Sequence, residues 1–203
     1  MDALLARVAT DEFEEGGIAV VQHSATTGRG MTLTIDLHAD GSAPEHWVVD
    51  CENVRECRIG WEPASSLRFL SDHVLLAPYA DAHVTLATRG PVTDARHAVA
   101  DLWQVHQDLA RDWFPLSAFL NTGMRLTDLL SSSAIVAEGP SRFIDAYQKV
   151  LTMNGTDAYT PWLRAPAQWR DGAWQPEAPG MSVLLLRPHF IVGSGFSARR
   201  DPQ

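Results

Sequence analysis

The pattern that most constrains the fold of this chain is an amphipathic helix predicted over residues 94–113. When the residues are placed at 100° steps, the apolar side chains of this segment fall within an arc of roughly 160°. Thr93 or Asp94 can cap the N-terminus, and Pro115 prevents the helix from continuing past Phe114. We therefore predict a helix whose apolar half packs on a sheet built from the preceding part of the chain.

The segments before this helix have the pattern of short β-strands. Apolar residues alternate with polar ones over residues 31–38, as expected for a strand with one buried face. Glycines at residues 28–30 predict a hairpin between this strand and residues 18–22. Further short strands are predicted at residues 46–51, 54–61, 67–70, 74–76 and 83–88.

This order of elements, several strands and then a long helix, is similar to that of pleckstrin-homology-like barrels. The similarity is one of order alone, because no motif accompanies it. It implies a curved sheet closed into a barrel and carries no functional conclusion.

The C-terminal half predicts a second amphipathic helix and a hairpin. Residues 139–141 open the helix and Asn154-Gly155 ends it. Asp171-Gly172 is a favoured two-residue turn, which would place Trp169 opposite Trp174. The apolar runs at residues 182–187 and 190–192 predict strands, the first buried on both faces.

Together these patterns predict an α+β fold. A curved, mainly antiparallel sheet of N-terminal strands and a C-terminal hairpin packs against the two amphipathic helices. We expect a single domain over residues 1–203. The alternative is a division near residues 131–133, into a β-rich part (16–114) and an α/β part (134–198).

Composition narrows the functional classes. The 203 residues are 45% hydrophobic and 20% charged, as in globular proteins. A net charge of −9 with a single lysine, Lys149, argues against nucleic acid as a partner and favours a basic protein surface. No membrane-spanning stretch and no signal peptide is recognisable, so we expect a cytoplasmic protein. The excess of arginine over lysine indicates a genomic composition bias, and we expect a bacterial source.

The two cysteines, Cys51 and Cys57, are too few for a disulfide scaffold, and we predict two buried thiols. His38 and His46 do not complete a recognised zinc spacing with them. We therefore expect neither a metal nor another cofactor.

The candidates for catalysis are aspartates beside histidines. Asp72-His73 and Asp81-Ala82-His83 would come together if residues 74–76 paired with residues 83–86. An aspartate that orients a histidine serves general-base catalysis and metal sites. A small metal-assisted hydrolase is therefore one hypothesis, although no nucleophile motif is present and structural turns explain the same residues.

His106 lies on the apolar side of the predicted helix. Such a histidine is usually neutral and hydrogen-bonded inside the core. At the border of a cavity it could instead act as a base.

Our leading hypothesis is a non-catalytic binding protein, of the inhibitor or immunity type, that engages a basic protein partner. The residues proposed for this contact are a polar helix strip and three tryptophans of the irregular segment 156–181: Asp94, His97, Asp101, Asp108, Trp162, Trp169 and Trp174. Alternatively, the helix strip is simply a solvent-exposed face, and the tryptophans cover the hydrophobic core of this protein itself. A third hypothesis is a ligand-binding module whose curved sheet encloses a pocket.

Overall fold

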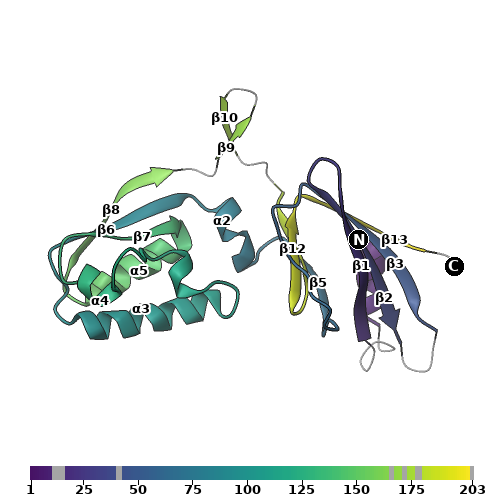
Figure 1. The fold of residues 1–203 in the computed structure, drawn as a ribbon, viewed down its shortest axis with the longest axis horizontal. Coiled ribbons are helices and arrows are strands. Elements are labelled where there is room, and N and C mark those ends of the chain that lie inside the picture. The colour runs from purple at the N-terminus through teal and green to yellow at the C-terminus, as the bar shows by residue number, and fades with distance from the viewer. Residues whose placement is uncertain (11–16, 40–42, 165–166, 171–172, 177–179, 202–203) are drawn as a thin grey trace. The chain divides into compact units, whose positions relative to one another are not determined.

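The computed structural model describes residues 1–10, 17–39, 43–164, 167–170, 173–176 and 180–201. Its contacts divide the chain into two compact units (Figure 1). The first unit comprises residues Met1–Leu76 and Ala178–Gln203, and the second comprises Ala77–Glu177. The second unit is thus inserted between two segments of the first. Residues 131–133, the alternative boundary, lie inside the second unit, and a single folding domain stays a prediction.

The first unit contains two four-stranded antiparallel sheets. The β1 sheet has the order β1 (Gly17–Thr26), β2 (Gly30–His38), β3 (Glu45–Glu52) and β13 (Gly195–Arg200). The β11 sheet has the order β4 (Glu56–Arg58), β12 (His189–Gly193), β11 (Ser182–Leu186) and β5 (Leu67–Leu70). The C-terminal hairpin therefore joins strands from the N-terminal part, as predicted. The described strands of these sheets do not close into a barrel, so the implied pleckstrin-homology-like architecture is wrong.

The core of the first unit lies between these sheets. Along β2, Leu33, Ile35 and Leu37 are fully buried and the residues between them are less so, which confirms the predicted alternation. The same apolar cluster contains Leu184 and Leu186 of β11, together with Leu4 of the short helix α1 (Asp2–Val8). Because side chains alternate between the faces of a strand, the inner face of each sheet is apolar.

The second unit is a three-stranded antiparallel sheet covered by helices. Its order is β7 (Ile135–Pro140), β6 (His83–Arg89) and β8 (Asp157–Arg164). Helix α5 (Ser141–Met153) packs on all three strands, and α3 (Ala95–Ala110) packs mainly on α5 (Figure 1). The prediction that residues 94–113 pack directly on the preceding strands is therefore wrong, because the apolar face of α5 lies against that of α3.

The shorter elements complete both units. They are η2 (Val74–Leu76), α2 (Ala77–Ala80), η3 (Leu116–Ala118), α4 (Leu126–Leu129), β9 (Ala167–Arg170) and β10 (Ala173–Pro176). None of the described helices is long and apolar enough to cross a membrane.

Helix α3 begins where the sequence predicts and ends earlier. The Asp94 carboxylate accepts hydrogen bonds from the backbone N–H groups of Arg96 (2.9 Å) and His97 (3.1 Å). The helix ends at Ala110, since Arg111 adopts a φ of 50°. This turn brings the Phe114 carbonyl back to the helix, where it lies 2.8 Å from Nε2 of His106.

The predicted strand at residues 74–76 is wrong. These residues form the 3₁₀ turn η2, in which Leu75 and Leu76 are buried. A short apolar run is compatible with either structure, and only its surroundings decide between them. Strand β6 pairs with β7 and β8 instead.

The predicted hairpin at residues 169–174 has the expected register, with Trp169 opposite Trp174 and Arg170 opposite Ala173. The Asp171-Gly172 turn lies outside the described residues. Helix α5 ends as predicted, since Gly155 follows its C-cap with a φ of +82°.

Candidate functional site

The four aspartate and histidine residues first proposed for catalysis are divided between the two compact units. Asp72 and His73 belong to the first unit, whereas Asp81 and His83 belong to the second. His73 Nδ1 accepts a hydrogen bond from the Leu75 N–H at 3.3 Å. The pairing of residues 74–76 with β6 that would have joined the two Asp-His groups does not form.

Asp81 is held by Arg142 in the first turn of α5. Nη2 of Arg142 lies 2.8 Å from Oδ1 of Asp81, and Nε donates to Oδ2, so the pair is bidentate. His83 Nε2 lies 3.4 Å from the Pro78 carbonyl oxygen. The Asp81–Arg142 pair ties the start of β6 to α5, and the His83 contact ties it to α2.

Within the described ranges, no group of three or more His, Cys, Asp and Glu side chains lies close enough to hold a metal ion. The hydrolase hypothesis therefore has no assembled site in this part of the chain.

His106 is fully buried and both of its ring nitrogens are engaged. Nδ1 lies 2.6 Å from the Tyr147 hydroxyl, and Nε2 lies 2.8 Å from the Phe114 carbonyl oxygen. Burial raises the pKa of Tyr147, so its hydroxyl stays protonated and shares a hydrogen bond with Nδ1. Nε2 carries the proton of its hydrogen bond to Phe114, because a carbonyl oxygen only accepts.

Aromatic rings surround this hydrogen-bonded pair. The rings of Phe119 and Phe143 lie 6.4 and 5.8 Å from the imidazole centroid. The structure thus places His106 in the core of the second unit, with one hydrogen bond more than the sequence predicted. Its buried ring, with both nitrogens engaged, is that of a structural histidine.

The polar strip of α3 is engaged mostly within the chain. Asp94 caps the helix, and its carboxyl pKa is lowered by hydrogen bonds from the backbone of His97 and Arg96. Asp101 accepts a hydrogen bond from Asn154 at 2.9 Å and lies 3.5 Å from the His97 ring, and Asp108 accepts one from Gln104 at 3.1 Å. Three of the four proposed contact residues therefore already have partners within this chain, and the fourth, His97, pairs with one of them.

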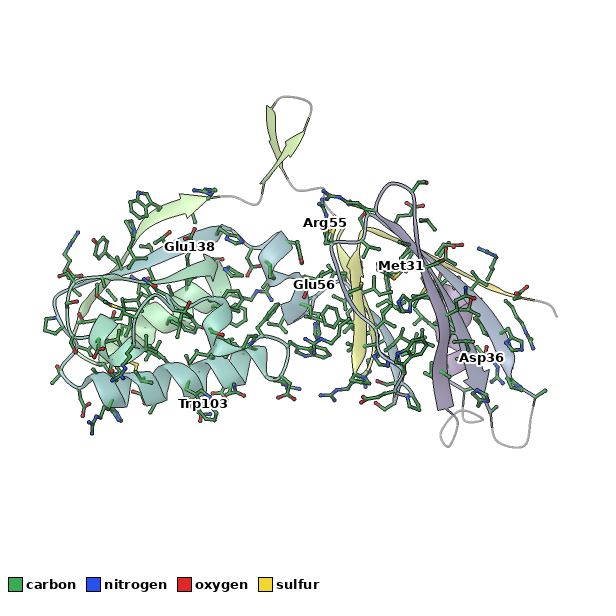
Figure 2. The ribbon with its side chains drawn as sticks, in the orientation of Figure 1. Met31, Asp36, Arg55, Glu56, Trp103 and Glu138 are labelled. Atoms are coloured by element: carbon green, nitrogen blue, oxygen red, sulfur yellow. The ribbon has the colours of Figure 1, made fainter. Side chains whose placement is uncertain are left out.

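Two exposed apolar positions were not singled out from sequence. Trp103 belongs to the apolar residues of the arc predicted for residues 94–113, but it is 52% exposed, and Figure 2 shows it on the outer side of α3. Leu163 is 73% exposed, and it follows Trp162, a predicted partner-contact residue that is 62% exposed. Trp103 lies at the edge of the apolar arc, where a helical pattern does not discriminate burial.

Strand β8 is one of the two edge strands of its sheet, and its pairing is irregular beside these exposed residues. Its register with β6 shifts between the pairs Thr85–Trp162 and Ala87–Tyr159, which leaves an extra residue at Thr160-Pro161. Proline is tolerated in sheets at such edges and bulges because it lacks an N–H donor. Trp162 and Leu163 follow directly after the bulge. The side chains of Trp169 and Trp174 lie outside the described residues.

A shallow apolar groove lies between η3 and α4. It has a volume of about 430 Å³, and its lining residues are Leu116, Ser117, Leu120, Asn121, Thr122, Met124 and Leu126. The groove belongs to the second unit and not to a curved sheet, so it does not match the enclosed pocket of the third hypothesis.

No known protein family, characterised protein or solved structure matches this chain.

The two cysteines differ in exposure. Cys51 is buried, whereas Cys57, on the three-residue edge strand β4, is exposed. The prediction of two buried thiols is wrong for Cys57. Its strand β4 lies at the edge of the sheet and has a neighbouring strand, β12, on one side only. Of the histidines weighed as zinc ligands, His46 lies 2.6 Å from Asp36 instead.

This difference predicts the thiol reactivity of the native protein. Burial raises the pKa of Cys51 to about 12, and the nearby Asp50 and Cys57 contribute in the same direction. At neutral pH we expect a maleimide to modify Cys57 and to spare Cys51, because the thiolate is the reacting form. Mass spectrometry of the intact protein should show one adduct, and two in denaturant. Two adducts on the native protein would contradict the burial of Cys51.

Two carboxylates of β3 predict acid sensitivity of the first unit. A hydrogen bond from Arg7 lowers the pKa of Glu45, and a hydrogen bond from Thr32, with Arg199 nearby, lowers that of Asp50. A lowered folded-state pKa stabilises the protein above the ordinary values of 4.5 and 3.8, and this stabilisation is lost as the pH falls through the lowered values. We expect Thr32→Val to reduce the drop in melting temperature between about pH 7 and about pH 3.

The matched control is Thr34→Val, which lies two residues further along the same face of β2. It should leave the pH dependence unchanged. An equal change in both variants would show that the effect does not arise at Asp50.

Proposed function

We propose that this protein is a non-catalytic binding protein whose second unit engages a protein partner. The observation that carries the proposal is the exposure of Trp162 and Leu163 at the end of the edge strand β8.

Consecutive residues of a strand point to opposite faces. Because both side chains are mostly exposed, the end of β8 presents an apolar residue on each face, and its outer backbone edge pairs with no further strand among the described residues. Tryptophan is among the residues that contribute most to protein interfaces, since it buries a large rigid surface. A partner that covers this end would bury both side chains.

The charge of the chain supports a basic partner. The net charge of −9 attracts a positively charged surface and accelerates association with it. A protein of this kind could mask a basic enzyme, as inhibitor and immunity-type proteins do. Because Asp94, Asp101 and Asp108 are engaged within the chain, we place the main contact at β8 and not on α3.

The test is affinity capture from a lysate of the source organism. Trp162→Ala/Leu163→Ala should lose partners that the wild-type protein retains, with a loss of binding free energy of about 2 kcal/mol or more. The matched control is Trp61→Ala, which removes an 89% exposed tryptophan from the first unit. If the double variant and the control retain the same partners as the wild type, the proposal is wrong.

The groove between η3 and α4 favours a second candidate function, the binding of a small apolar ligand. A ligand present at a hundred times its Kd would stabilise the second unit by about 2.7 kcal/mol. A panel of metabolites should then raise the melting temperature of the wild-type protein and not that of Leu120→Lys.

A further inference from the structure

The sheets of the first unit end in four edge strands, and three of these are short and charged. Strand β13 carries Arg199 and Arg200, β4 consists of Glu56–Arg58, and β5 carries Arg68. Short, charged strands are the usual protection of a sheet edge, because an added strand would have to bury their charges.

Strand β1 lacks this protection. It has ten residues, and among them are no Asp, Glu, Lys, Arg or Pro. A long edge strand without charges is a surface on which another strand can add. The two edges of this sheet therefore differ: β1 carries no charged residue, whereas β13 carries two arginines.

The free part of this edge can be located. At the start of β1, the Ala64 N–H donates to the Ile18 carbonyl at 2.7 Å, which closes that end. Beyond the bulge at Val21, the strand pairs with β2 on one side, and residues 21–26 are all exposed. Within the described residues, the outer backbone groups of this segment meet no other strand.

We propose that β1 pairs with β1 of a second copy of this protein, in antiparallel orientation about a two-fold axis, to form a continuous eight-stranded sheet. A two-fold axis places the same segment on both sides of the contact, so the surface must be self-complementary. Residues 21–26 meet this condition, because an uncharged strand opposes no like charges when it faces its own copy.

The same features limit the assembly to two copies. Each copy offers one uncharged edge in this sheet, and pairing consumes it. The arginines of β13 protect the other edge from further addition. Six residues extend about 20 Å, so the contact is small and the dimer should dissociate on dilution.

The test is sedimentation velocity of the full chain from about 1 to about 200 μM, a range that covers weak dimers. The wild-type protein should pass from monomer to dimer. Gln22→Lys/Ser24→Lys introduces like charges on the outer face of the free segment, opposite Thr34 and Thr32 of β2. This variant should dimerise at least about tenfold more weakly.

Ser197→Lys is the matched control, because Ser197 is exposed on β13, at the other edge of the same sheet. It should dimerise as the wild type does. A wild-type protein that stays monomeric throughout the range would overturn the proposal. A dimer that is weakened equally by the control, or not at all by the double variant, would overturn it too.

A charge-reversal experiment distinguishes lost pairing from lost folding. Gln22→Glu/Ser24→Glu should also be a monomer, but an equimolar mixture with the lysine variant should again form dimers, since opposite charges then face each other. Unfolded variants would not recover in this way. If two well-folded charge variants, checked by circular dichroism, do not associate when mixed, the pairing of β1 with β1 is wrong.

Discussion

A chain truncated after residue 177 is expected to lose the folded structure of its first unit and to keep that of its second. The truncation removes β11 and β12, the two central strands of the β11 sheet, and the edge strand β13. It also removes Leu184, Leu186 and Ile191 from the core. At about 1.5–3 kcal/mol for each buried side chain, this loss is comparable with the whole stability of a typical domain, about 5–15 kcal/mol.

Amide NMR spectra would measure the effect residue by residue. Signals of β2 and β3 should collapse to the positions of an unfolded chain, while those of α3 and α5 stay dispersed. The matched control is the fragment 77–177, whose spectrum should coincide with the surviving signals. Dispersed signals from β2 in the truncated chain would contradict the two-segment construction of the first unit. An unfolded fragment 77–177 would show instead that the two units fold as one domain.

His106→Ala is expected to destabilise the second unit by about 3–5 kcal/mol, the range for removal of a large buried side chain. The substitution leaves a cavity beside Phe119 and Phe143. It also leaves the Tyr147 hydroxyl and the Phe114 carbonyl without their hydrogen bonds. Tyr147→Phe, which leaves only Nδ1 of His106 unpaired, should cost about 1–3 kcal/mol.

Urea unfolding followed by NMR or by hydrogen exchange would report the free energy of the second unit. His97→Ala is the matched control, because His97 lies on the same helix with its side chain 68% exposed. That change should stay within about 0.5 kcal/mol of the wild type. A loss below about 1 kcal/mol for His106→Ala would contradict a buried, fully hydrogen-bonded imidazole.

Much of the secondary structure follows from local patterns. The alternation over β2 predicts its buried face, Asp94 predicts the start of α3, and the Asp171-Gly172 turn predicts the register of Trp169 with Trp174. Each of these features depends on neighbours in the chain, so the sequence contains the necessary information. The burial of His106 is of the same kind, since its position on the helix places it among apolar residues.

The candidate site was less predictable, because a site depends on which residues meet. Asp81 pairs with Arg142, which lies on another element 61 positions away, and no local pattern relates the two. Trp103 lies at the limit of an apolar arc, where the helical pattern does not predict whether a neighbouring element covers the side chain. The exposure of Trp162 and Leu163 depends on the position of β8 at the edge of its sheet.

The amino-acid sequence by itself therefore determined the α+β class, the two amphipathic helices and most strands, because hydrophobic periodicity and turn formation depend on residues that are near neighbours in the chain. The tertiary structure decided that residues 178–203 complete a pair of sheets begun by residues 17–70, and that α3 packs on α5. It also decided that the long, uncharged strand β1 lies at the edge of its sheet. Pairing between distant strands is selected by the total area that the whole chain buries, and no short segment contains that quantity.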